Sequence, residues 1–67
     1  MIKVDTVHLT DTKIAEIYKN SHQEGYRIMI VQAYKNESGT WNDDQVLDAR
    51  SYKTLGRASN NFIESWR

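Results

Sequence analysis

The stretch YRIMIVQAYK, residues 26–35, decides the fold because its apolar side chains occupy both faces of an extended chain. Side chains alternate between the two faces of a strand. Two apolar sets therefore share the stretch: Tyr26, Ile28 and Ile30 on one face, and Met29, Val31 and Ala33 on the other. Strands that are apolar on both faces are typical of a central position in a sheet. We therefore predict a central strand over residues 26–35, paired along both edges.

The residues that follow predict a hairpin and a return strand. Residues 36–39, NESG, are typical of a hairpin turn, with Gly39 available for a left-handed conformation. The polar triplet 42–44, NDD, interrupts the next strand and is expected to be solvated around a bulge. Regular pairing is then expected over residues 45–52.

The residues before the central strand indicate their secondary structure less clearly. Residues 20–25, NSHQEG, have the composition of a turn in which Gly25 can adopt a positive φ. Residues 10–19 allow either a short helix capped by Thr10 or Asp11, or a strand over residues 13–19, and the strand is favoured because a two-turn helix is marginal in isolation. Residues 1–9 are β-prone, but their alternation breaks between Val4 and Val7, which indicates an edge strand at most.

A closing amphipathic helix is predicted from Leu55 to Trp66, with Thr54 as its N-cap. One apolar stripe at helical spacing supports it: Leu55, Ala58, Phe62 and Trp66, extended by Ser59 and Ile63. The stripe must lie against one face of the sheet, and Phe62 and Trp66 are expected to contribute most to the core. The other sheet face would stay open unless residues 1–9 fold over it.

The 67 residues therefore predict one small α+β domain, a three-stranded antiparallel sheet packed on one C-terminal helix in the order β-β-β-α. Its parts are an N-terminal segment over residues 1–12, which is either a fourth, edge strand or irregular, the sheet over 13–52, and the helix over 54–66.

Composition narrows the class of protein. The chain has no cysteine, no apolar run long enough for a membrane span, and no basic and apolar leader, so we expect a cytoplasmic protein without a membrane partner. Nine basic and nine acidic residues cancel, whereas dedicated nucleic-acid binders usually carry a basic excess. A homodimer remains open, because oligomerisation is one of the common ways to stabilise so small a core.

No pattern in the sequence indicates catalysis, a metal or a cofactor. His8 and His22 are isolated from any nucleophile pattern. Asp43, Asp44 and Asp48 lack the oxygen spacing of a calcium loop. The glycines stand alone and form no phosphate-binding loop. We expect a binding protein rather than an enzyme.

Charge is distributed unevenly along the chain. Residues 36–49 carry four acids and no Lys or Arg, and the acids and aromatic residues of this hairpin are the candidate protein-binding residues: Tyr34, Glu37, Trp41, Asp43, Asp44 and Asp48. Basic residues follow at once, where Lys53 and Arg57 flank the expected helix start and could hold an anion. The candidate nucleic-acid-binding residues are Arg27, Arg50, Lys53 and Arg57.

Residues 13–66 resemble the arm-type DNA-binding domain of tyrosine-recombinase integrases. The matching residues are Ile17-Tyr18-Lys19, Gly25-Tyr26-Arg27, the strand end and turn at residues 34–39, and Ser51-Tyr52-Lys53-Thr54 leading into a helix that closes on Phe62 and Trp66. The resemblance implies a β-β-β-α fold whose sheet binds the DNA major groove, with Arg27, Arg50, Lys53 and Arg57 as contacts. The family is rich in Lys and Arg where this chain is acidic, from Glu37 to Asp48.

Two functions follow. The first is a small regulator or inhibitor, of the kind found in phages and mobile elements, that docks through its acidic hairpin on a basic and nucleic-acid-binding surface of a host protein. The alternative is a small DNA-binding regulator that uses the sheet and the basic corner. The acidic hairpin favours a protein partner.

Overall fold

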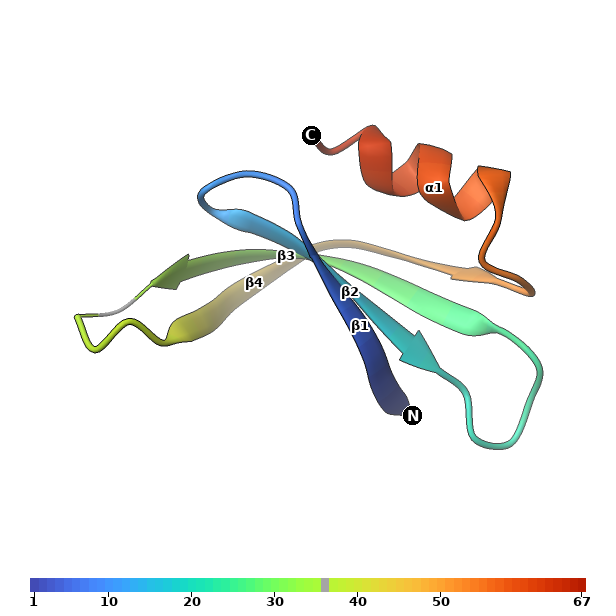
Figure 1. Cartoon of the computed structure of the whole chain (residues 1–67). Coiled ribbons are helices and arrows are strands. Elements are labelled where there is room, and N and C mark those ends of the chain that lie inside the picture. The colour runs from blue at the N-terminus through green and yellow to red at the C-terminus, as the bar shows by residue number, and fades with distance from the viewer. Residues whose placement is uncertain (36) are drawn as a thin grey trace.

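The computed structural model describes residues 1–35 and 37–67, and for residues 34, 35 and 41–44 it describes the backbone alone. It contains β1 (Ile2–His8), β2 (Lys13–Lys19), β3 (Tyr26–Lys35), β4 (Trp41–Tyr52) and α1 (Arg57–Glu64). The strands form one antiparallel sheet in the order β1-β2-β3-β4, with the helix beside one face (Figure 1). The predicted α+β class is confirmed, and the N-terminal segment forms a fourth, edge strand.

The central strand lies where the sequence predicts it. β3 spans Tyr26–Lys35 and pairs with β2 on one side and β4 on the other. Ile28 and Ile30 are buried in a cluster on the helix side of the sheet, and Val31 and Ala33 are buried in a second cluster on the opposite side. Both apolar faces of β3 are therefore used.

Residues 13–19 form a strand, and the alternative of a short helix is wrong. The Thr10 hydroxyl accepts hydrogen bonds from the backbone N–H groups of Thr12 and Lys13, at 3.3 and 3.1 Å, and so closes the turn between β1 and β2. β2 is then paired along both edges, which outweighs the marginal local helix propensity. Residues 1–9 do not fold over the open sheet face, since β1 extends the same sheet.

The return strand starts earlier than predicted. β4 begins at Trp41 rather than Gln45, and its pairing with β3 skips two residues, Asp44 and Leu47. The expected bulge at the polar triplet is confirmed. The strand continues through it because a bulge leaves one residue unpaired and keeps the ladder on both sides.

The helix is shorter than predicted at both ends. It begins at Arg57 after Gly56, and Thr54 is not its N-cap. Ser59 displaces the expected cap: its hydroxyl accepts a hydrogen bond from the Gly56 N–H at 2.9 Å and donates one to the Gly56 carbonyl at 2.8 Å. The helix ends at Glu64, so Trp66 lies in the turn that follows.

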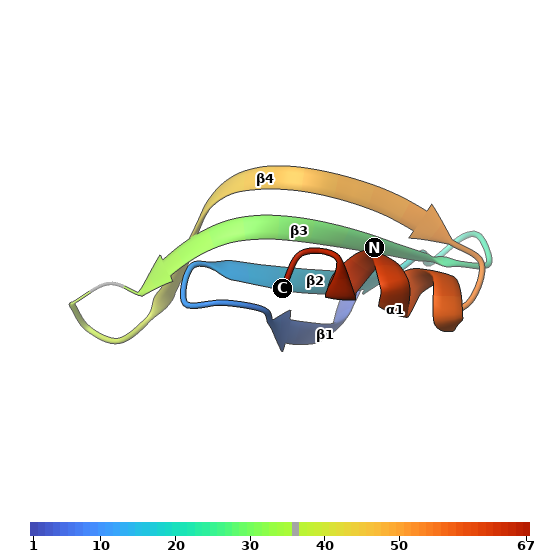
Figure 2. The same ribbon diagram turned by 90° about the horizontal axis from the view of Figure 1, so that it is seen from above.

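The helix lies over the middle of the sheet and reaches β4 through Phe62 (Figure 2). Seen from above, it lies over β2 and the neighbouring part of β1, and β4 curves past at the far margin (Figure 2). Phe62 and Ile63 join the helix-side core with Ala15, Ile17, Ile28 and Ile30. Leu55 and Ala58, both predicted for the buried stripe, are exposed: Leu55 precedes the helix, and Ala58 lies in its first turn on the side toward β4.

Candidate protein-binding surfaces

Of the six candidate protein-binding residues, the structure describes the side chains of Glu37 and Asp48. Glu37 is exposed in the turn between β3 and β4. The side chains of Tyr34, Trp41, Asp43 and Asp44 lie outside the described part of the chain. Asp48 does not belong to the hairpin end at all. It lies on the helix side of β4, paired with Ile30 of β3.

The β3–β4 hairpin extends well beyond the rest of the sheet. The last pair between β2 and β3 joins Lys13 to Gln32, whereas β3 and β4 remain paired as far as Lys35 and Trp41. The end of the hairpin is therefore two-stranded and projects from the four-stranded body (Figure 1). The acidic residues 37, 43 and 44 all belong to this projecting part.

The four candidate basic residues do not form one surface. Arg50 pairs with Ile28, and Arg27 pairs with Ser51, one position along the same two strands. Since successive residues point to opposite faces, Arg27 and Arg50 lie on opposite faces of the sheet. Lys53 follows β4 in a bend and Arg57 is the first residue of α1, and both are exposed. The expected basic corner is thus spread over both faces of the sheet and the connection between β4 and α1.

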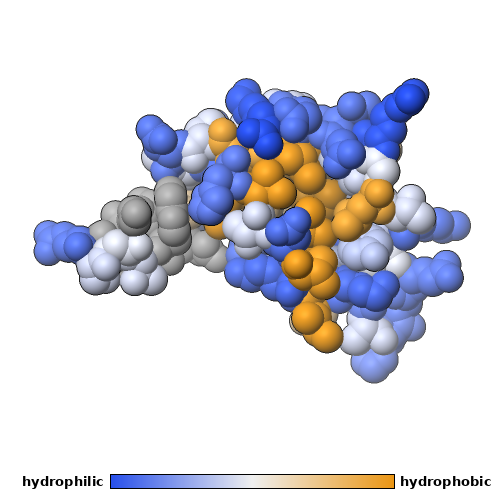
Figure 3. All heavy atoms as spheres, viewed as in Figure 1, coloured by the Kyte–Doolittle hydropathy of each residue, from blue (hydrophilic) through white to orange (hydrophobic). Residues whose placement is uncertain are grey.

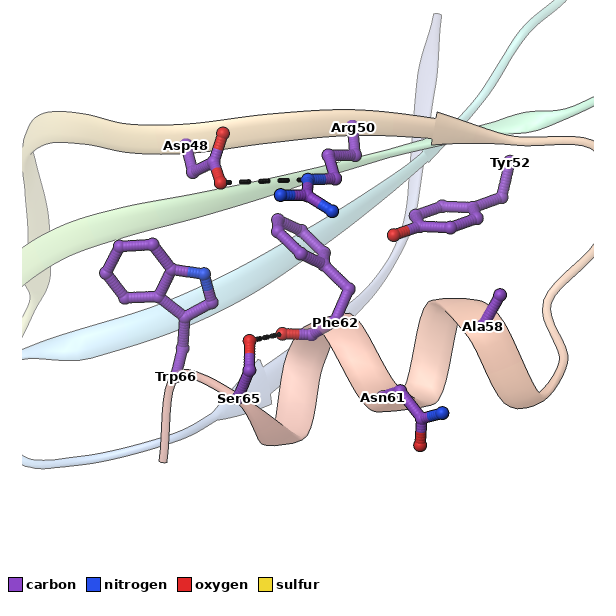
Figure 4. A pocket seen from close by; sticks show the side chains of 8 residues that line it. All are labelled: Asp48, Arg50, Tyr52, Ala58, Asn61, Phe62, Ser65 and Trp66. Atoms are coloured by element: carbon purple, nitrogen blue, oxygen red, sulfur yellow. Dashed lines mark hydrogen bonds and ion pairs between the residues drawn. The ribbon is translucent and has the colours of Figure 1, made fainter.

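A cleft that the sequence did not predict runs between β4 and α1. It has a volume of about 600 Å³. Its lining comes from the helix side of β4 and from the side of α1 turned toward β4: Asp48, Arg50, Tyr52, Ala58, Asn61, Phe62, Ser65 and Trp66 (Figure 4). The spacing of the lining residues in the sequence agrees with this arrangement. Residues 48, 50 and 52 lie on one face of a strand, and residues 58, 61, 62 and 65 lie on one side of a helix.

The cleft combines an aromatic floor with an accessible cation. The Phe62 ring lies between Tyr52, whose ring centroid is 6.1 Å away, and the guanidinium of Arg50, 4.9 Å from the ring centroid. The Arg50 side chain is 62% exposed, and its Nε lies 3.9 Å from the Asp48 carboxylate, at the long end of ion pairing. Guanidinium groups carry five donors. Much of that donor capacity faces the cleft and solvent.

Both edge strands contain the same local arrangement, a β-bulge followed by an aspartate that accepts a backbone hydrogen bond. In β1 the pairing skips Val4, and the next residue, Asp5, accepts a hydrogen bond from the backbone N–H of Thr6 at 2.8 Å. In β4 the pairing skips Leu47, and Asp48 accepts one from the N–H of Ala49, also at 2.8 Å. The bulges at Val4 and Leu47 are therefore each followed by an aspartate that occupies a backbone donor of its own edge strand.

Apolar side chains are exposed at the start of β1. Met1 and Ile2 are about two-thirds exposed and Val4 about half. Figure 3 shows hydrophobic residues in a band from the contact between helix and sheet down along β1. This apolar strip lies on the edge opposite the cleft, because β1 and β4 are the two ends of the sheet.

His8 and His22 are both exposed, one in β1 and one in the turn between β2 and β3. Among the residues whose placement is described, no group of three or more His, Cys, Asp or Glu side chains could hold a metal ion. Within the same residues, no helix is both long and apolar enough to cross a membrane.

Comparison with protein-family models, with curated proteins and with solved structures finds no match to this chain.

Proposed function

We propose that the protein is a non-catalytic binding module, a small regulator or inhibitor of phage or mobile-element type that acts in the cytoplasm. Its partner is a host protein with a basic surface of the kind that also binds nucleic acid. One observation carries the proposal: the β3–β4 hairpin projects beyond β2 as a two-stranded, acid-rich arm.

Charge and shape support a protein partner. The arm, from residue 36 to residue 44, contains three acids and no Lys or Arg, while the whole chain is neutral. A negative arm on a chain of zero net charge speeds association with a positive surface and fixes the orientation of docking. The arm also carries Trp41, and aromatic residues supply much of the binding energy in protein interfaces.

A charge-reversal experiment tests the proposal. Asp43→Lys combined with Asp44→Lys should abolish capture of the partner from host cells, and with the purified partner it should slow association at least tenfold at low salt. The matched control is Asp11→Lys with Glu24→Lys, the same change in charge at two exposed loop positions. Equal binding by the arm variant and the control would contradict docking through the arm.

A second function, DNA binding, is favoured by the exposure of all four candidate basic residues. Under this proposal the protein binds mixed-sequence duplex DNA in a salt-dependent manner. Arg50→Ala with Lys53→Ala lowers the affinity, and it also lowers the slope of log K against log salt, by nearly one for every phosphate that is no longer neutralised. An absence of binding at about 50 mM salt would exclude it.

A further inference from the structure

We propose that the cleft between β4 and α1 is a second binding site, which takes an extended acidic peptide segment of a partner protein as a fifth strand along the outer edge of β4. The proposal does not depend on the acidic arm, which lies at the other end of β4.

The first support is the position of the cleft. β4 is an edge strand with no further strand on its outer side, and three of its residues, Asp48, Arg50 and Tyr52, line the cleft. The Ala49 N–H donates a hydrogen bond to the Asp48 carboxylate of its own strand, so we place this N–H on the outer edge of β4. By the alternation of an antiparallel ladder, Ser51 faces the same way. Because Asp48 already occupies the Ala49 N–H, the template for an added strand consists of the Ser51 N–H and the carbonyl groups of Ala49 and Ser51.

The second support is the chemistry of the lining. A strand added beside β4 places every second side chain on the helix side, over the Phe62 ring and between α1 and β4. There it meets Arg50, which is 62% exposed and only loosely paired with Asp48, at 3.9 Å. A carboxylate opposite Arg50 forms a charge-assisted, bidentate pair. In the added strand, apolar side chains two residues before and two residues after this carboxylate would contact Tyr52 and Trp66.

The third support is charge complementarity around the cleft. Arg57, on the first turn of α1, and Lys53, just after β4, are exposed near the end of the cleft where Ala58 and Tyr52 lie. Among the described residues that line the cleft, Asp48 is the one acid. Its carboxylate already accepts the Ala49 N–H. The occupant is therefore an acidic segment in which an Asp or Glu alternates with apolar residues.

The test uses an end-blocked peptide, Thr-Leu-Thr-Asp-Thr-Leu-Thr, titrated into the isotope-labelled protein and followed by NMR. The sequence is palindromic, so it serves whether the added strand runs parallel or antiparallel to β4. We expect a dissociation constant on the order of 1 mM or tighter, as befits so small an interface. The largest shift changes should fall on the Ser51 amide and the Trp66 indole. Replacing the central Asp by Asn should weaken binding about fivefold.

Two variants assign the interaction to the cleft. Arg50→Gln should weaken the Asp peptide about fivefold and remove the difference between the Asp and Asn peptides. Ala58→Glu places a carboxylate at an exposed position of the cleft and should also weaken binding of the acidic peptide. The variant should still fold, because an acidic residue in the first turn of a helix is favourable. Arg27→Gln is the matched control, because this exposed arginine lies on the opposite face, and it should leave binding unchanged.

Three outcomes of the peptide titration would contradict the proposal. No shift change up to about 5 mM peptide, equal binding of the Asp and Asn peptides, or changes confined to β1 would each overturn the proposal. Reversal of Asp43 and Asp44 should leave peptide binding intact, so failure of the arm and failure of the cleft are distinguishable.

Discussion

Glu16 lies on the sheet face opposite the helix with only 3% of its side chain exposed. Its register neighbours on that face are Thr6 of β1 and Met29 of β3. The Lys3 ammonium, itself half-exposed, lies 2.6 Å from the Glu16 carboxylate. A buried carboxylate is costly unless it is paired, so this ion pair ties the edge strand β1 to β2.

We predict that Lys3→Met destabilises the protein by about 1–3 kcal/mol, because it leaves the Glu16 carboxylate buried without its cation. Adding Glu16→Met should recover most of that stability, since an apolar pair of similar size needs no charge compensation. Urea unfolding of the two single variants and the double variant measures both effects. A double variant no more stable than Lys3→Met would contradict this account of the pair.

At the residue scale the two predicted glycine turns are confirmed. Gly25 and Gly39 have φ of +124° and +86°, in the region where other residues are strained. Gly25 is constrained further, since a Cβ there would lie 3.0 Å from the Tyr52 carbonyl oxygen. The burial of Glu16 could not be predicted. It depends on the pairing of β2 with both β1 and β3, and the register between two strands is not encoded in the local pattern of either strand.

At the element scale, the two edge strands share a feature that opposes pairing with further copies of the sheet. Edge strands expose free backbone groups that pair readily with other chains. Here Val4 and Leu47 interrupt the two edges as bulges, and Asp5 and Asp48 each bond an adjacent N–H. Each aspartate thus removes a donor and adds a negative charge at an edge.

We predict that Asp5→Ala combined with Asp48→Ala increases self-association, because each edge loses one negative charge and regains a free N–H. Sedimentation velocity should show a dimer or larger species at a protein concentration at least tenfold lower than for the unmodified chain. Asp11→Ala, in the exposed turn between β1 and β2, is the control for a simple removal of negative charge. If all three proteins sediment alike, the edge aspartates do not limit association.

The bulge in β1 is visible in the sequence as the break in alternation between Val4 and Val7. The helix boundary is not, because Thr54 and Ser59 are both residues of the capping type and only their geometry decides between them. Ser59 is buried and bonds both backbone groups of Gly56, so the helix starts after Gly56.

At the scale of the whole molecule, the cleft depends on where the helix sits across the sheet. The amphipathic pattern shows which side of the helix is buried, but not which strands it covers. Phe62 and Ile63 pack against β2 and β3, and this leaves the helix side of β4 partly uncovered. Residues 50 and 52 thereby become cleft residues rather than core, which sequence reasoning could not anticipate.

The same arrangement makes Phe62 the main link between the helix and the sheet. It is 6% exposed, contacts the Tyr52 ring and lies under Arg50. A domain of this length has a folding free energy of about 3–10 kcal/mol, and removal of a buried phenylalanine costs about 3–5 kcal/mol. The two quantities are of the same order, so loss of this one side chain should remove a large part of the stability of the domain.

We therefore predict that Phe62→Ala unfolds a substantial fraction of the protein at room temperature. Urea titration followed by circular dichroism should show a midpoint lower by at least half, or no folded baseline at all. Leu55→Ala, at a position 45% exposed before the helix, is the control and should cost less than about 1 kcal/mol. A Phe62→Ala protein that keeps its midpoint would contradict the assignment of Phe62 as a main contact between the helix and the sheet.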